Sequence, residues 1–292
     1  MKIAIYSKVF KEEAKDYIQL LFNEFRKYEF DISIYSEYLP DLERKIEINN
    51  SYSTFTSYED LTSGYDFMFC IGGDGTILSA ATLVRDLNIP ILGINTGRLG
   101  FLANVSKKDI QKTILQLLAG RYVIEDRAMI SISNMGHVFG ELNFAVNEVT
   151  INRKDTTSMI SVKVCLDNNF LNTYWADGLI VSTPTGSTGY SLSCGGPIIM
   201  PGSQNFVITP IAPHNLNVRP LVVDDNHELT IHVQGREDEY LIGLDSRIYT
   251  VKVGAELHIK KADFTISMVT PENHDYPSTL RNKLLWGLDR RN

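Results

Sequence analysis

The hydrophobic pattern of the chain changes its period near residue 123, and this change limits the folds that the chain can adopt. Before it, short apolar runs typical of buried strands alternate with segments whose apolar residues recur at helical spacing. Residues 2–7 predict a strand, and the following segment predicts a helix. The apolar face of that helix carries Ala14, Tyr17, Ile18, Leu21, Phe22 and Phe25.

The same alternation continues to residue 122. Residues 30–39, 65–71 and 89–95 predict strands, while a polar stretch around 43–60 gives little signal. Two further helices are predicted, at 77–87 and at 108–122. The second has Ile110, Ile114, Leu117 and Leu118 at helical spacing and Gly120 as its stop. Strands that alternate with helices predict a doubly wound, mostly parallel sheet, so residues 1–122 are expected to form an α/β domain.

After residue 123 the apolar residues alternate with period two, as in "ISVKVCL" (160–166) and "ELTIHVQ" (228–234). Polar turns such as "DNN" (167–169) and "GRED" (235–238) separate these runs. We therefore expect an all-β, antiparallel, sandwich-like domain over residues 123–270. Pro277 can start a last helix with Leu280, Leu284 and Leu288 on one stripe, and we expect residues 271–292 to pack back on the first domain.

Composition excludes several classes of function. The chain of 292 residues is 43% hydrophobic and carries a formal net charge of -7, which disfavours a general attraction to nucleic acid or to an anionic membrane. Its three cysteines are widely spaced and form no C-x-x-C pattern, so neither a disulfide framework nor a zinc site is expected. With no leader and no apolar window of about 18 residues, the sequence predicts a cytoplasmic protein that does not bind membranes.

The stretch "FCIGGDGTILSA" (69–80) joins a buried strand to a helix through glycines. Such a turn lets backbone N–H groups converge on a phosphate without side-chain obstruction. Asp74 would repel that phosphate unless it contacts a bridging metal ion or takes a proton from an attacking hydroxyl, so phosphoryl transfer is indicated. The alternative is a tight turn in which Asp74 only caps the helix. The G-x-G-x-x-G dinucleotide pattern is absent, which weakens a dehydrogenase interpretation.

Two polar segments of the second half are further candidates. Asn147-Glu148 follows an alternating run and offers donors and acceptors to a ribose, with a solvated strand edge as the alternative. The segment "DGLIVSTPTGSTGYSLSCGGPI" (177–198) repeatedly pairs glycine with hydroxyls, as a large polar ligand requires. Tyr190 can stack on a base there, although a core tyrosine is the commoner case.

These motifs, with "GINTGRLGFLA" (93–103) and "APHNLNVRPLVV" (212–223), occur in the order found in the NAD kinases, and the chain resembles that family from about residue 68 to 247. The resemblance implies a kinase that phosphorylates the adenosine 2′-hydroxyl of NAD with ATP or polyphosphate, an α/β domain followed by a β domain, and commonly a homotetramer. One departure is Gly189, where many relatives have alanine.

The resemblance also implies the site residues. Asp74 would be the catalytic base. The expected phosphate and ATP contacts are Gly72, Gly73, Gly75, Thr76 and Arg98. The expected NAD contacts are Asp74, Gly75, Asn147, Glu148, Trp175, Asp177, Thr185, Thr188, Gly189, Tyr190, Ser191, Leu192, Ser193, Ala212, Asp245 and Arg247. Asp245 and Arg247 are equally compatible with a plain turn.

The predicted function is therefore an NAD kinase that uses ATP or another phosphoryl donor. No protein metal site is expected, because Mg²⁺ or another divalent cation would be held mainly by the phosphates. Two alternatives remain open at this point. A diacylglycerol-type lipid kinase would share GGDGT, and a non-catalytic sensor would bind NAD without turnover.

Overall fold

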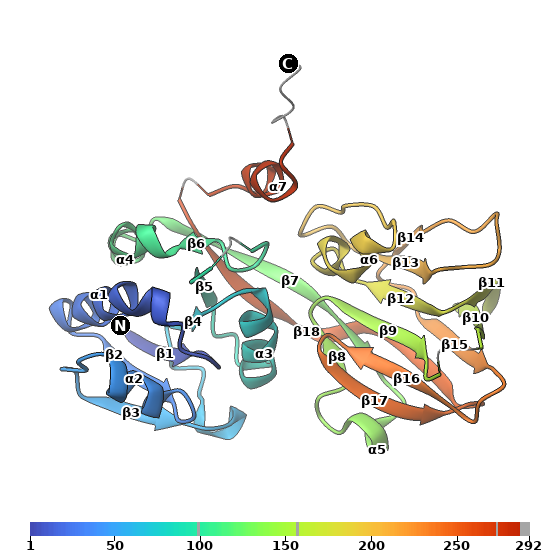
Figure 1. Ribbon diagram of the computed structural model, residues 1–292, viewed down its shortest axis with the longest axis horizontal. Coiled ribbons are helices and arrows are strands. Elements are labelled where there is room, and N and C mark those ends of the chain that lie inside the picture. Colours follow the sequence, from blue (N-terminus) through green and yellow to red (C-terminus); the bar gives the residue numbers. More distant parts are fainter. Residues whose placement is uncertain (98–99, 156–157, 273, 287–292) are drawn as a thin grey trace. The chain divides into compact units, whose positions relative to one another are not determined.

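The computed structural model describes residues 1–97, 100–155, 158–272 and 274–286 (Figure 1). The chain forms two compact units, Met1–Asp126 together with Ile266–Asn292, and Arg127–Thr265. It leaves the first unit within strand β7 (Tyr122–Ile132) and returns within strand β18 (Glu256–Pro271). The boundaries expected from the sequence, 122/123 and 270/271, fall inside these two long strands. The functional division into three segments stays a prediction.

The first unit contains a parallel sheet with the strand order β18-β5-β4-β1-β2-β3, and β6 also pairs with β5. Its strands are β1 (Lys2–Tyr6), β2 (Asp31–Tyr35), β3 (Tyr52–Phe55), β4 (Phe67–Ile71), β5 (Ile91–Asn95) and β6 (Val105–Ser106). Its α-helices are α1 (Lys15–Lys27), α2 (Leu39–Lys45), α3 (Asp74–Val84), α4 (Ile110–Leu118) and α7 (Tyr276–Leu284). Single 3₁₀ turns occupy Glu12–Ala14, Tyr58–Asp60 and Lys107–Asp109.

Alternation along the strands assigns the helices to opposite faces of this sheet. Phe67, Phe69 and Ile71 of β4 share one core with the apolar stripes of α1 and α4. The residues between them point to the other face. There α3 packs so closely on β5 that a Cβ on Gly93 would lie 2.5 Å from Ile77 Cδ1. Helices on both faces of a parallel sheet are the doubly wound arrangement that the sequence predicts.

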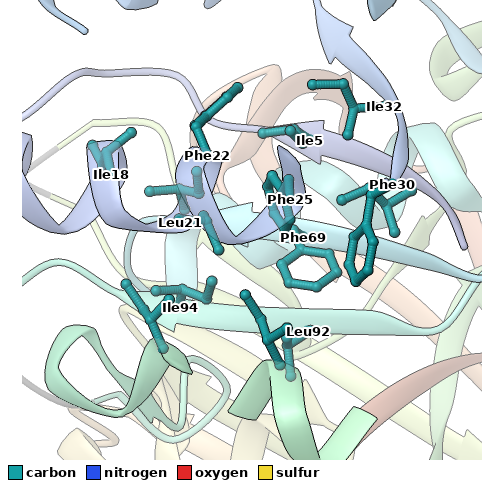
Figure 2. Packing of buried hydrophobic residues seen from close by; sticks show 14 of the residues in the cluster. Ile5, Ile18, Leu21, Phe22, Phe25, Phe30, Ile32, Phe69, Leu92 and Ile94 are labelled. Carbon is teal, nitrogen blue, oxygen red and sulfur yellow. The ribbon is translucent and has the colours of Figure 1, made fainter. Parts of the chain in front are cut away.

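Aromatic rings fill the core beneath α1, as Figure 2 shows. The Phe25 ring lies 5.4 Å from that of Phe30 and 5.2 Å from that of Phe69, centroid to centroid. Edge and offset contacts at such distances are the arrangements that aromatic quadrupoles favour. The core of the first unit therefore fixes α1 against the middle strands of the sheet.

Some elements differ from the sequence prediction. The polar stretch around 43–60 contains β3, and the expected strand at 30–39 ends at Tyr35, before α2. Both missed elements bury too little to give a pattern, since only Phe55 of β3 and Leu42 of α2 are buried. Leu118, expected on the buried face of α4, is 43% exposed.

The second unit contains two antiparallel sheets. One has the order β14-β13-β12-β9-β16-β17, and the other contains β11-β10-β15-β18 with β7 and β8. The strands are β8 (Phe144–Ala145), β9 (Glu148–Arg153), β10 (Ile160–Leu166), β11 (Asn169–Ala176), β12 (Gly178–Ser182), β13 (Asn205–Ile211), β14 (Leu221–Asp224), β15 (Leu229–Gln234), β16 (Glu239–Leu244) and β17 (Arg247–Lys252). Its helical turns are α5 (Gly136–Phe139), Gly186–Thr188 and α6 (Tyr190–Ser193).

A single hydrophobic core lies between these two sheets, with Val162 and Ile231 from one and Val181 and Ile242 from the other. The turn at Asp167-Asn168 has φ of 47° and 67°, the left-handed pair that a tight hairpin requires. Both the period-two pattern and the "DNN" turn are thus explained. The predicted fold class, an α/β domain followed by an antiparallel β domain, is confirmed.

The predicted C-terminal helix is present as α7. The Asp275 carboxylate caps it by accepting a hydrogen bond of 2.6 Å from the backbone N–H of Ser278. Leu280 is buried and Leu284 half-buried, whereas Leu288 lies outside the described residues. No helix in the described part of the chain has the length and apolarity needed to cross a bilayer.

Candidate functional site

In the first unit, the glycine-rich turn places the start of α3 at the carboxyl end of β4. Gly72 donates its N–H to Ile94 O at 2.9 Å, and a Cβ at this position would lie 2.1 Å from Thr76 Oγ1. Only glycine therefore fits at 72. No side chain caps the helix, and Gly73, Gly75 and Thr76 are not buried. The N–H groups of Asp74 and Gly75, at the start of α3, consequently remain available to an anion, whereas that of Thr76 donates to Gly73 O at 2.9 Å.

Asp74 is the first residue of α3, but its carboxylate is directed at the loop that follows β5. Oδ1 accepts the backbone N–H groups of Leu102 at 3.0 Å and Ala103 at 2.9 Å, and Oδ2 accepts that of Phe101 at 2.9 Å. Asp74 thus does not cap its own helix. The loop can approach because residue 100 is glycine, since a Cβ there would lie 1.8 Å from Asp74 Oδ1.

From this loop the sequence predicts only Arg98 as a ligand contact, and Arg98 lies outside the described residues. Gly100 and the N–H groups of residues 101–103 were missed as the partners of Asp74. The available signal was Gly100 itself, a second glycine close to the predicted phosphate turn.

In the second unit, Asn147 and Glu148 lie where the chain passes from β8 into β9. The Asp245 carboxylate fixes this junction by accepting backbone N–H groups of Val146 at 2.9 Å, Asn147 at 2.8 Å and Glu148 at 3.3 Å. Glu148 is only 8% exposed. The alternative of a solvated strand edge is therefore wrong for Glu148.

Burial controls the charge of Glu148. Loss of solvent raises the pKa of its carboxyl to about 8, the nearby Asp245 adds to this, and a hydrogen bond from the Tyr190 backbone N–H opposes it. Its Oε2 has no hydrogen-bond partner in the described part of the chain. A buried carboxyl with an unpartnered oxygen is unusual in a folded protein and is typical of a ligand site.

Asp245 lies in the turn between β16 and β17, Arg247 begins β17, and both side chains bind backbone groups of the same unit. Asp245 has φ of 53°, and Arg247 donates to the carbonyl oxygens of Leu142, at 2.6 Å, and of Phe144. Desolvation raises the pKa of Asp245, whereas its N–H donors and the charge of Arg247 lower it. The turn interpretation that the sequence left open therefore agrees with these contacts, in which Asp245 holds the backbone of Asn147 and Glu148.

Part of the segment 177–198, which is rich in threonine, serine and glycine, packs against the same junction. Thr183 donates its N–H to Asn147 O at 2.9 Å and its hydroxyl to Val146 O at 2.6 Å. Gly186 lies so close that a Cβ would be 2.1 Å from Asn147 O. A glycine and a hydroxyl of this segment thus hold it against the junction between β8 and β9. Thr183 and Ser182, which is paired in register with Glu148, were not selected from the sequence.

The remaining predicted contacts differ in accessibility. Ser191 is fully buried, and its hydroxyl bonds to Thr209 Oγ1 at 2.8 Å. Tyr190 and Trp175 are 42% and 57% exposed, so Tyr190 is not a core tyrosine. The other predicted residues that reach the surface, at least in part, are Asp177, Thr185, Thr188, Gly189, Leu192, Ser193 and Ala212.

Two of these residues show local constraints. Asp177 forms an ion pair of 2.8 Å with Arg153, and Ala212 has φ of 45°. Around Glu148 the structure brings together Asn147, Gly189, Tyr190 and Asp245. Ser191 cannot present its hydroxyl to a ligand in this arrangement.

Among the described residues, no three His, Cys, Asp or Glu side chains cluster closely enough to hold an ion. In the glycine-rich turn, Asp74 Oδ2 accepts a single N–H and keeps a lone pair, whereas Oδ1 already accepts two. The turn therefore offers a metal ion at most one carboxylate ligand.

Solved structures show which class of protein this fold defines. The crystal structure of yeast NADH kinase complexed with NADH has a TM-score of 0.87 at 21% identity, over 98% of this chain and 88% of that one. The crystal structure of an NAD kinase from Archaeoglobus fulgidus in complex with ATP has a TM-score of 0.73 at 25% identity, over 98% of both chains. The class is that of two-domain phosphotransferases.

Sequence comparison then gives the family. Residues 15–122 match the ATP-NAD kinase N-terminal domain, and residues 146–270 match the ATP-NAD kinase C-terminal domain. NAD kinases of Flavobacterium johnsoniae and Cytophaga hutchinsonii are 49% and 46% identical, each over the full length of both chains. A Bacteroides fragilis NAD kinase is 40% identical over the full length of both chains. The chain belongs to the NAD kinase family, and the predicted resemblance is confirmed.

Proposed function

We propose that this protein is an NAD kinase that transfers the terminal phosphoryl group of ATP to the adenosine 2′-hydroxyl of NAD, giving NADP. The observation that carries the proposal is the uncapped start of α3 behind Gly72 and Gly73, with Asp74 beside it, in a chain of this family. The family membership favours NAD over a lipid as the acceptor. No structural feature favours the diacylglycerol-type alternative or a sensor without turnover.

In the proposed reaction, the N–H groups of the glycine-rich turn hold the phosphates of the donor. Asp74 Oδ2, which accepts only one N–H, retains a lone pair that can accept the proton of the 2′-hydroxyl. Phosphoryl transfer passes through a loose transition state, so late proton removal and accurate positioning suffice. Arg98 is proposed to contact the phosphates as well.

The second unit supplies the proposed NAD contacts. Asn147 and Glu148 would bind the adenosine half, with Tyr190 and Trp175 exposed enough to contact a base or the nicotinamide end. Thr185, Thr188, Gly189, Leu192, Ser193, Asp177 and Ala212 would complete the pocket. Asp245 and Arg247 would position Asn147 and Glu148 rather than touch NAD, and Ser191 would support the segment from within.

Mg²⁺ is the proposed divalent cation. It would neutralise phosphate charge when bound. Because the described residues form no protein-held metal site, it would be carried mainly by the donor phosphates. A homotetramer and a cytoplasmic location are proposed with it, and the three unpaired cysteines agree with a reducing compartment.

The test is a product assay. Purified protein is incubated with NAD, ATP and Mg²⁺, and NADP is measured. Parallel reactions replace ATP by polyphosphate, omit Mg²⁺ with a chelator, or replace NAD by its analogue without the adenosine 2′-hydroxyl. NADP should form only from NAD, and phosphate transfer to the deoxy analogue would assign the reaction to another hydroxyl.

A further inference from the structure

The Glu148 carboxyl lies in surroundings that hold a negative charge poorly. The residue is 8% exposed, and Oε2 has no hydrogen-bond partner in the described part of the chain. Among the described residues, the Tyr190 backbone N–H is the donor that lowers the pKa of this carboxyl. A buried, ionised carboxylate normally accepts several hydrogen bonds. When these donors are missing, burial of the charge costs free energy.

Its neighbour Asp245 is also buried, and desolvation raises its pKa, but it has more partners that favour the charged form. Three backbone N–H groups and the charge of Arg247 stabilise a negative charge on Asp245. Two buried carboxyls this close do not both ionise readily, and the one with fewer donors keeps the proton. The other groups that face Glu148 do not change this. Desolvation raises the pKa of the Tyr190 phenol, which keeps it uncharged, and Ser182, opposite in register, is neutral.

The unpartnered oxygen of Glu148 lies against the backbone of Gly189. A Cβ on Gly189 would lie 3.1 Å from Glu148 Oε2, 3.2 Å from Gly186 O and 3.5 Å from Asn147 Nδ2. The absence of a side chain at residue 189 therefore lets the Glu148 carboxyl and the Asn147 amide approach the same stretch of backbone. A ligand that binds against this stretch would meet the Asn147 amide and the Glu148 carboxyl together.

We propose that Glu148 binds the dinucleotide as a neutral carboxylic acid, donating a hydrogen bond to an uncharged acceptor atom of the ligand beside Gly189. This inference rests on the proposed function, because it names the role of a residue in the proposed NAD site. It adds to the expectation from sequence, in which Asn147-Glu148 offers donors and acceptors to a ribose, that Glu148 acts as the donor.

The proposal has a consequence for pH. Only the protonated form donates, so NAD affinity is full below the pKa of Glu148 and falls as the pH rises through it. Well above that value the loss approaches tenfold per pH unit. An acceptor carboxylate would give the reverse, with affinity that rises with pH.

The experiment measures the Kd for NAD, without a phosphoryl donor, from pH 6.5 to 9.5. Wild-type affinity should fall at alkaline pH. Glu148→Gln, whose amide can still donate, should keep most of the affinity at pH 7 and show a flat profile in this range. Glu148→Ala, which leaves Asn147 alone beside Gly189, should bind roughly tenfold more weakly at pH 7. The matched control is Glu237→Gln, an exposed carboxyl of the same unit, which should follow the wild type.

Three results would overturn the proposal: wild-type affinity that rises with pH, a wild-type profile that parallels Glu148→Gln, or Glu148→Gln as weak as Glu148→Ala. Carbon-13 NMR of the Glu148 side-chain carboxyl in otherwise unmodified protein is a second measurement that needs no variant, and an ionised carboxylate at pH 7 would also reject the proposal. Failure of the function itself is distinguished by the product assay, which would then yield no NADP at pH 7 from a protein that still binds NAD.

Discussion

Asp74 combines two tasks, because the carboxylate proposed to act on the substrate also holds residues 101–103 in place. Asp74→Asn should therefore lower activity and stability together. A general base contributes about 10²–10⁴-fold to kcat. The amide group would also point N–H groups at backbone N–H groups, and hydrogen bonds to a charged acceptor are worth roughly 1.5–3 kcal/mol. Steady-state kinetics and urea unfolding measure the two effects.

The control for this variant is Asp16→Asn, an exposed aspartate of α1 in the same unit, which should change neither quantity. A near-normal kcat in Asp74→Asn would remove Asp74 from the proposed chemistry. A normal urea midpoint would instead show that the loop does not depend on the carboxylate.

Gly100 gives a prediction without any change of charge. In Gly100→Ala the new methyl would overlap Asp74 Oδ1, at a distance of 1.8 Å, so the carboxylate or the loop must move. We expect a loss of kcat on the scale of Asp74→Asn. Gly64→Ala is the matched control, because its Cβ meets only Thr62 Oγ1 at an ordinary 3.6 Å. Wild-type activity in Gly100→Ala would show that the turn tolerates displacement of Asp74.

For single residues, the sequence predicted the members of the candidate site more accurately than the contacts that these residues make. Asp74, Asn147 and Glu148 were selected from their motifs. The burial of Glu148 was not predictable, because it depends on Thr183 and Gly186 closing over the junction from another part of the chain. The hydrogen bond between Ser191 Oγ and Thr209 Oγ1 was equally unpredictable, because only the fold brings these two residues together.

Among the elements, β18 carries a histidine that bonds to a carboxylate of its own strand and to one just before β15. His258 of β18 bonds through Nδ1 to Glu228 at 2.6 Å and through Nε2 to Glu256 at 2.5 Å. Both ring nitrogens face carboxylates, so the imidazolium is favoured. The hydrogen bond to Glu228 is the main cause that raises the pKa of His258.

A raised pKa in a histidine stabilises the folded state below the unfolded pKa of about 6.5 and loses that contribution as the pH rises through the folded value. The urea midpoint of the wild type should therefore fall between pH 6 and pH 8.5 by more than that of His258→Asn. His137→Asn, an exposed histidine of α5, should retain the wild-type dependence. If the urea midpoints of the wild type and of His258→Asn depended on pH in the same way, His258 would be excluded as the source of the pH dependence.

Elements that bury several apolar residues on one face were predictable from the sequence, whereas elements that bury only one were not. The helix α1 buries four apolar side chains along one stripe, Ile18, Leu21, Phe22 and Phe25, and the periodicity of these residues predicted it. The helix α2 buries one residue and begins with Pro40 near its first turn, so its formation depends on tertiary contacts that no local pattern records.

For the whole molecule, the separate cores of the two units give a prediction about folding. The core of Arg127–Thr265 contains only residues of that unit. Just outside it, the two ends of the first unit are joined by a hydrogen bond of 2.7 Å from Ser267 Oγ to Asp126 Oδ1. A fragment of residues 127–265 should therefore fold alone, with a cooperative urea transition and a near-ultraviolet circular dichroism spectrum.

The complementary fragment, residues 1–126, is the comparison. It lacks the end of β18, where Met268 is in register with Ile91 of β5, and it lacks α7. We expect it to be less stable than the same unit in the full chain. A fragment 127–265 without a cooperative transition would mean that the second unit needs the first in order to fold.

The return of β18 to the first unit also sets an order of events on the ribosome. Residues 1–126 emerge first, but the strand that pairs with β5 emerges only after residues 127–265. At about 5–20 residues per second, that interval lasts roughly 7–28 s. During it, the hydrophobic β5 lacks one of its partners, and an unpaired strand edge is where newly made chains aggregate. We therefore expect the yield of folded protein in the cell to depend on chaperones and on translation speed across residues 127–265, a stretch far in sequence from the edge it leaves exposed.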